Sequence, residues 1–183
     1  MNEDVKIIHR ILRGEKDEYA VLMDRYHNEL FSYVYNLVVQ VETTEDLLQD
    51  IFLKIYKKLH KYDAKKASFR TWMYRIAHNE VINYLRSSQV KYQTGVIDKI
   101  EFIEDDEDIE HDVIKEEKMN LILKAINKRL KKKHKDIMFL HYFSGLTVKE
   151  ISEVLDIPDK TIYHAIDSSI AKIKEAVQLY EKV

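Results

Sequence analysis

Residues that interrupt helices are nearly absent from this chain, and this constrains its fold more than any other feature. The 183 residues include only 3 glycines and 1 proline. Glycine weakens a helix and proline breaks one, so the long segments in which apolar residues recur every three or four positions can continue as helices. Hydrophobic residues make up 45% of the chain and charged residues 34%, which is typical of a folded protein rather than a disordered one. The sequence therefore predicts an all-α protein.

Four helices account for the first half of the chain. Their predicted ranges are 3–13, 16–40, a third that ends near His60, and a fourth over 68–88. Thr43 or Thr44 is placed to cap the third helix, and Ser68 to cap the fourth. Four helices with short connections can close one core. We therefore expect a first domain, a helical bundle, over residues 1–92.

The fourth helix carries a polar stripe opposite its apolar face. At 100° per residue, the polar side chains of this helix fall within an arc of roughly 80°. The stripe consists of Arg75, Asn79, Asn83 and Arg86, with Trp72 at its edge. Arginine binds phosphates, asparagine reads base edges, and tryptophan stacks on unpaired bases. The stripe is therefore a candidate nucleic-acid surface, and the alternative is the solvated face of an ordinary amphipathic helix.

Two further polar surfaces flank this helix in the sequence. Asp46, Gln49 and Asp50 lie on the side of the third helix that faces away from its apolar residues. A basic stretch follows, made of Lys54, Lys57, Lys58, Lys61, Lys65, Lys66 and Arg70. Such lysines either keep the surface soluble or extend the neighbouring stripe into a phosphate-binding footprint.

An acidic segment separates the two halves of the chain. Residues 98–117 contain eleven acidic residues against Lys99 and Lys115, without a sustained apolar period. A run of like charges repels itself and favours an extended or disordered conformation. We therefore expect a flexible linker over residues 93–117.

The remaining residues, 118–183, read as a second small helical domain built on a helix-turn-helix. After a basic corner at residues 128–135, an apolar helix ends at Ser144-Gly145. Thr147 and Glu150 have the spacing of a capping box that opens a short helix. Asp156 tolerates the left-handed turn that follows, and a long helix begins near Asp159.

The run from Asp46 to Ser88 resembles conserved region 2 of the extracytoplasmic-function sigma factors, sigma-70 family subunits that bring bacterial RNA polymerase to promoters. The resemblance rests on D-L-x-Q-D-x-F from Asp46, F-R-x-W-x-Y-R-I-A-x-N from Phe69, and N-Y-L-R from Asn83. It implies that the third helix binds the β′ clamp of core polymerase through the outward residues Asp46, Gln49 and Asp50, together with Phe52 of its apolar side. It also implies that the polar stripe contacts the minus ten promoter element, through Trp72, Arg75, Asn79, Asn83 and Arg86.

The run from Gly145 to Glu175 resembles sigma region 4, which implies contacts with the β flap of polymerase and with the minus thirty-five element. The residues that would carry the DNA contacts are Thr161, Tyr163, His164, Ser168 and Lys172. Recognition helices of the family usually carry several Arg or Lys just after the T-V/I pair. Here the basic residues return only at Lys172 and Lys174, so the electrostatic contribution of this helix to DNA binding should be small.

Several function classes are disfavoured by what the sequence lacks. Without cysteine there is no disulfide or thiolate metal site, and no glycine-rich phosphate loop or H-E-x-x-H motif is present. We therefore expect no enzymatic activity, cofactor or metal. The polar N-terminus and the absence of a long apolar run favour a cytoplasmic protein. The family also implies a possible anti-sigma partner.

Two alternatives to a sigma factor stay open on the residues alone. One is a helix-turn-helix regulator that acts without polymerase, which should have a basic recognition helix and a dimer interface. The other is an interaction protein that kept the sigma fold but lost DNA binding, which the scarcity of cations in the recognition helix favours.

Overall fold

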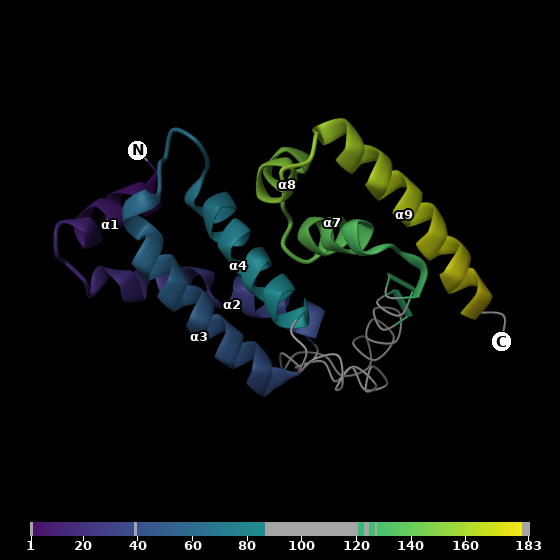
Figure 1. The fold of residues 1–183 in the computed structure, drawn as a ribbon, viewed down its shortest axis with the longest axis horizontal. Helices are drawn as coiled ribbons and strands as arrows, with labels where there is room; N and C mark the ends of the chain where they lie inside the picture. Colours follow the sequence, from purple (N-terminus) through teal and green to yellow (C-terminus); the bar gives the residue numbers. More distant parts are fainter. Residues whose placement is uncertain (1, 39, 87–120, 123–124, 127, 181–183) are drawn as a thin grey trace, which may run out of the picture.

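The computed structural model describes residues 2–38, 40–86, 121–122, 125–126 and 128–180 (Figure 1). The elements are α1 (Glu3–Leu12), α2 (Glu18–Val38), α3 (Val41–Lys58), the 3-10 helix η1 (Leu59–Lys61), α4 (Phe69–Arg86), α7 (Lys132–Tyr142), α8 (Val148–Leu155) and α9 (Asp159–Tyr180). Each of these elements is helical, so the expected all-α fold is confirmed. Within the described ranges, no helix is long and apolar enough to cross a membrane.

Local capping signals place several helix ends where the sequence predicts them. The Ser68 hydroxyl accepts a hydrogen bond from the backbone N–H of Thr71 at 3.0 Å, so it caps α4. Thr147 and Glu150 form a complete capping box at the start of α8, and Asp156 ends that helix with φ of 55°. Such caps satisfy backbone groups that a helix leaves unpaired at its ends.

Two helices begin earlier than predicted. α3 starts at Val41 with Gln40 at its N-cap position, so the prediction of a cap at Thr43 or Thr44 is wrong. The Thr44 hydroxyl instead donates to the Gln40 carbonyl at 2.8 Å from within the first turn. α7 starts at Lys132, and residues 128–129 are helical as well, so only residues 130–131 of the expected basic corner are not helical. Lysine is a good helix former.

α4 is the central element, with α3 on one side and α8 on the other (Figure 1). Phe69, Met73 and Val81 are buried on the predicted apolar face. Tyr74 and His78 are buried as well, 0% and 7% exposed, although the sequence pattern did not assign them to the core. At 100° per residue, Tyr74 falls between Val81 and Leu85 on the apolar face, and His78 falls at the edge of that face, where packing of other helices against α4 covers it.

The second helical unit (α7–α9) packs against the first (α1–α4) through partly polar contacts. The Arg70 side chain pairs with Glu29 of α2 at 2.6 Å and donates to the Ser144 carbonyl at the end of α7. Nearby, the Tyr33 hydroxyl lies 2.9 Å from His78 Nδ1 in a fully buried position. Arg70 was predicted to belong to the exposed basic stretch, but the structure directs it into the contact between the units.

Some predicted features lie outside the described residues. These are the domain boundaries at 92 and 117, the acidic segment 98–117, and the side chain of Arg86.

Candidate nucleic-acid interface

The α4 stripe comprises Trp72, Arg75, Asn79, Asn83 and Arg86. Arg75, Asn79 and Asn83 are exposed and Trp72 is half-buried, so these four side chains occupy the surface that the helical period predicts. Ser68 fixes where α4 begins, and the buried face of the helix fixes its rotation. These two constraints set the direction in which the stripe faces.

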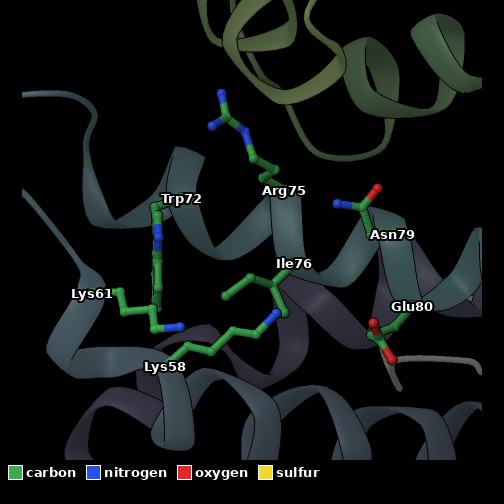
Figure 2. Close-up of a pocket in the computed structure, with 7 residues that line it drawn as sticks. All are labelled: Lys58, Lys61, Trp72, Arg75, Ile76, Asn79 and Glu80. Atoms are coloured by element: carbon green, nitrogen blue, oxygen red, sulfur yellow. The ribbon is translucent and has the colours of Figure 1, made fainter.

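A pocket of about 280 Å³ opens along this stripe. Its lining residues are Lys58, Lys61, Trp72, Arg75, Ile76, Asn79 and Glu80. Lys58 and Lys61 come from the end of α3 and from η1, and the others from α4 (Figure 2). The pocket therefore combines an indole wall, a side-chain amide and two ammonium groups, which are the groups that bind a base and its phosphates.

Aromatic packing holds the indole of Trp72 at the wall of this pocket. Its ring centroid lies 5.5 Å from that of Tyr62 and 5.9 Å from that of Phe69. Phe69 is buried in the core, so the indole is held on a rigid support. A preorganised stacking platform loses less conformational entropy when a base binds than a mobile side chain would.

Only part of the predicted basic stretch is available to bind phosphates. Lys54 pairs with Glu80 at 2.5 Å, and Lys66 lies 3.9 Å from Asp63. In the part of the chain that the structure describes, no carboxylate lies within 4.0 Å of the ammonium groups of Lys58 and Lys61. Among the described residues, the cations of this stretch without a carboxylate partner are therefore the two beside the pocket, together with Lys57 and Lys65, which are exposed.

Arg75 of the stripe makes a hydrogen bond to the second helical unit. Its guanidinium donates to the backbone carbonyl of Glu153 in α8, and Figure 2 shows its side chain directed away from Lys58 and Lys61. Asn79 and Trp72 remain at the open side of the pocket. The structure therefore brings Trp72, Asn79 and the two lysines together, while Arg75 is held by α8.

The residues predicted to contact polymerase divide into an exposed set and a buried one. Asp46, Gln49 and Asp50 are exposed on α3, whereas Phe52 is only 5% exposed. Phe52 instead lines an open hollow of about 390 Å³ between α2 and α3. Leu53, 50% exposed, lies on the same hollow. The sequence reasoning missed Leu53, although an apolar residue on the outward side of a helix is a signal of a contact surface.

The recognition helix α9 presents its predicted side chains at the surface. Thr161, Tyr163, His164 and Lys172 are exposed, and Ser168 is half-buried with its hydroxyl donating to the Ala165 carbonyl at 3.1 Å. The turn before α9 is held by the Ser152 hydroxyl, which donates to the Ile157 carbonyl at 2.7 Å. Within the described ranges, no three His, Asp or Glu side chains gather to hold a metal ion.

Comparisons with known proteins match both halves of the chain. The family model for Sigma-70 region 2 matches residues 22–90, and that for Sigma-70 region 4 matches residues 120–168. The chain is 32% identical to RNA polymerase sigma factor YlaC of Bacillus subtilis over 146 residues, which cover 76% of this chain and 80% of YlaC. The chain belongs to the sigma-70 family.

Further relatives place this sigma factor in the extracytoplasmic-function group. It is 28% identical to the ECF RNA polymerase sigma factor SigW of Bacillus subtilis, over 86% of this chain and 87% of SigW. Its fold matches that of the sigma factor RpoE of Bartonella quintana, solved in complex with the anti-sigma factor NepR, with a TM-score of 0.67 and 17% identity. That match covers 88% of this chain and 97% of RpoE. The resemblance of region 2 and region 4 to the family is confirmed, and the protein is an RNA polymerase sigma factor of the extracytoplasmic-function type.

Proposed function

We propose that this sigma factor captures an unpaired base of the minus ten element in the pocket beside α4. The observation that carries the proposal is the convergence of Trp72, Asn79, Lys58 and Lys61 on one pocket of about 280 Å³. The indole stacks on the base, the Asn79 amide bonds its edge, and the two lysines bind flanking phosphates. Asn83 and Arg86 extend the same surface along the helix.

The other predicted sites complete the proposal. Core polymerase docks on the outward side of α3 at Asp46, Gln49 and Asp50, with Phe52 supporting the neighbouring hollow. The second unit binds the β flap and reads the minus thirty-five element through Thr161, Tyr163, His164, Ser168 and Lys172. The protein acts in the cytoplasm, within the transcription complex and without an enzymatic step of its own. An anti-sigma factor that binds both units would cover the two DNA-binding surfaces.

Replacing Asn79 tests the base-capture proposal. We expect Asn79→Ala to relax the preference at one or two minus ten positions, because a lost base contact typically costs about 1–3 kcal/mol of discrimination. The measurement is in vitro transcription from a library of randomised promoters with core polymerase and each variant. Asn28→Ala, an exposed asparagine on α2, is the matched control. An unchanged minus ten profile for Asn79→Ala would show that the stripe is only a solvated helix face.

Charge reversal on α3 tests the docking site. The double substitution Asp46→Lys and Asp50→Lys should weaken binding to core polymerase while the helix content stays the same, because both carboxylates are exposed and make no ion pair within the described residues. Binding is measured by fluorescence anisotropy of a labelled sigma factor. The control is a second double variant, Asp17→Lys and Asp24→Lys, which changes the net charge by the same amount at other exposed positions. Its affinity for core polymerase should stay near that of the wild type. Equal affinity of both double variants would exclude this docking site.

A further inference from the structure

The pocket beside α4 contains a carboxylate among its cations and amides. Glu80 is the only acidic residue among the described residues that line it. Figure 2 shows the Glu80 carboxylate on one side of Ile76 and the indole of Trp72 on the other. Glu80 directly follows Asn79 in α4, so both lie toward the same end of the pocket. The pocket therefore has a stacking end at Trp72 and a hydrogen-bonding end at Asn79 and Glu80.

Lys54 of α3 holds one oxygen of this carboxylate and leaves the other oxygen available. Lys54 Nζ lies 2.5 Å from Glu80 Oε2. Among the described residues, Glu80 Oε1 has no hydrogen-bond partner. The buried side-chain atoms without a partner in these ranges belong to Tyr74 and Ser144, so Oε1 is accessible from the pocket. Glu80 therefore presents a fixed acceptor to a ligand.

A carboxylate does not treat the four bases alike. An ionised carboxylate accepts hydrogen bonds and cannot donate one. Adenine, cytosine and guanine each carry an exocyclic amino group that donates, and the cytosine amino group is a recognised partner of glutamate. Thymine has no amino group, and its one ring N–H lies between two carbonyl oxygens that a carboxylate repels. Among unpaired bases that enter the pocket, Glu80 therefore favours those with an amino group.

We infer that Glu80 is a specificity-determining residue that accepts a hydrogen bond from the amino group of the captured base and selects against thymine. The inference rests on the proposed capture of a minus ten base in this pocket. The other polar groups there discriminate less: Lys58 and Lys61 bind phosphates, which carry no sequence information. The Asn79 amide both donates and accepts, so it can bond either kind of base edge. The positive charge of Lys54 offsets that of Glu80, which limits repulsion between the carboxylate and the DNA phosphates.

The test compares wild-type protein with Glu80→Gln, each assembled with core polymerase, on a promoter library randomised across the minus ten element. At one position, the wild type should use thymine roughly 5- to 150-fold less well than the bases with an amino group, the range that one base contact contributes. In Glu80→Gln this ratio should fall to within about twofold, because the glutamine amide also donates to a carbonyl oxygen. Both proteins should have the same circular dichroism spectrum and the same affinity for core polymerase.

Two control variants distinguish base selection from loss of charge and loss of the ion pair. Glu15→Gln removes the same charge at an exposed position of the first unit and should keep the wild-type profile. Lys54→Gln keeps the Glu80 carboxylate and a donor for it, so this variant should still disfavour thymine. If Lys54→Gln relaxes the selection as much as Glu80→Gln does, Glu80 acts only through the ion pair and the inference is wrong. Equal thymine ratios in the wild type and Glu80→Gln would also overturn it.

Asn79→Ala separates this inference from the proposed function. If Asn79→Ala relaxes a minus ten preference while Glu80→Gln does not, the pocket captures a base and only the inference about Glu80 fails. If neither variant changes the minus ten profile, the proposed base capture fails as well.

Discussion

At the scale of single residues, the same type of side chain has different roles depending on its neighbours. Arg75 and Arg70 lie on the same helix and both donate to a carbonyl of the second unit, but Arg70 is half-buried and also pairs with Glu29, whereas Arg75 is exposed at the stripe. His134 of α7 lies 3.3 Å from the Ser169 hydroxyl of α9, and its pKa is lowered by burial and by the charges of Lys172, Lys131 and Lys133. Positive charges nearby disfavour the protonated imidazole.

The pKa of His134 should respond to a single charge removal. Lys172→Gln should raise it toward the ordinary histidine value, because one of the cations that disfavour protonation is lost. The measurement is a titration of the histidine ring protons by NMR. The control is Lys174→Gln, since Lys174 is an exposed lysine two residues after Lys172. This variant should leave the pKa of His134 unchanged. Equal titration curves for wild type and Lys172→Gln would mean that Lys172 does not lie close to His134.

At the scale of elements, short-range hydrogen bonds define where helices begin and packing defines which way they face. α8 has only eight residues, and isolated helices of that length are unstable in water. Its capping box therefore matters more than a cap does in a long helix. In α3 the corresponding position, Gln40, makes no side-chain capping bond, and the length and buried face of α3 compensate.

Thr147→Ala should destabilise the protein by about 1 kcal/mol, since it removes the capping hydroxyl from α8. Thr43→Ala is the control, because the Thr43 hydroxyl bonds only to the exposed side chain of Gln40 and should contribute less than about 0.5 kcal/mol. Both values come from urea unfolding followed by circular dichroism. A loss for Thr147→Ala no larger than that for Thr43→Ala would contradict a stabilising role of the capping box.

At the scale of the whole molecule, the contact between the two helical units lies beside the proposed DNA-binding stripe. α8 packs against α4 beside the stripe, and Arg75 donates to its Glu153 carbonyl. In the proposed function Arg75 belongs to the DNA-binding stripe, and its bond to this carbonyl would compete with a phosphate for the same guanidinium. The contact contains charged and polar groups, which is typical of interfaces between domains that move relative to each other.

Arg70→Ala should loosen the contact between the units, because it leaves the half-buried Glu29 without its partner. The chain has no cysteine, so spin labels can be attached at Lys65→Cys and Lys149→Cys, two exposed positions in different units. Electron paramagnetic resonance should show a longer and broader distance distribution in the variant. As a control, Lys66→Ala removes an exposed ion pair, in which Lys66 Nζ lies 3.9 Å from Asp63 Oδ2. It should leave the distance distribution unchanged. The same distribution in all three proteins would show that Arg70 does not hold the units together.

Much of this protein follows from local sequence. The helical period, the Ser68 cap, the Thr147–Glu150 capping box and the left-handed Asp156 depend on residues within about four positions of one another, and the structure contains each of them. The exposed positions of Arg75, Asn79 and Asn83 follow from the same period. These features could be predicted because their interactions are complete within one turn of the chain.

Other features depend on which elements meet in space. The burial of His78 and the inward direction of Arg70 both require neighbours from other helices. The pocket beside Trp72 needs lysines that precede it by more than ten residues, and the lowered pKa of His134 needs α7 beside α9. Helical period distinguishes a polar face from an apolar one, but it contains no information on which distant helix covers a flank. Tertiary packing decides that, because burial and charge pairing depend on distances in space rather than along the chain.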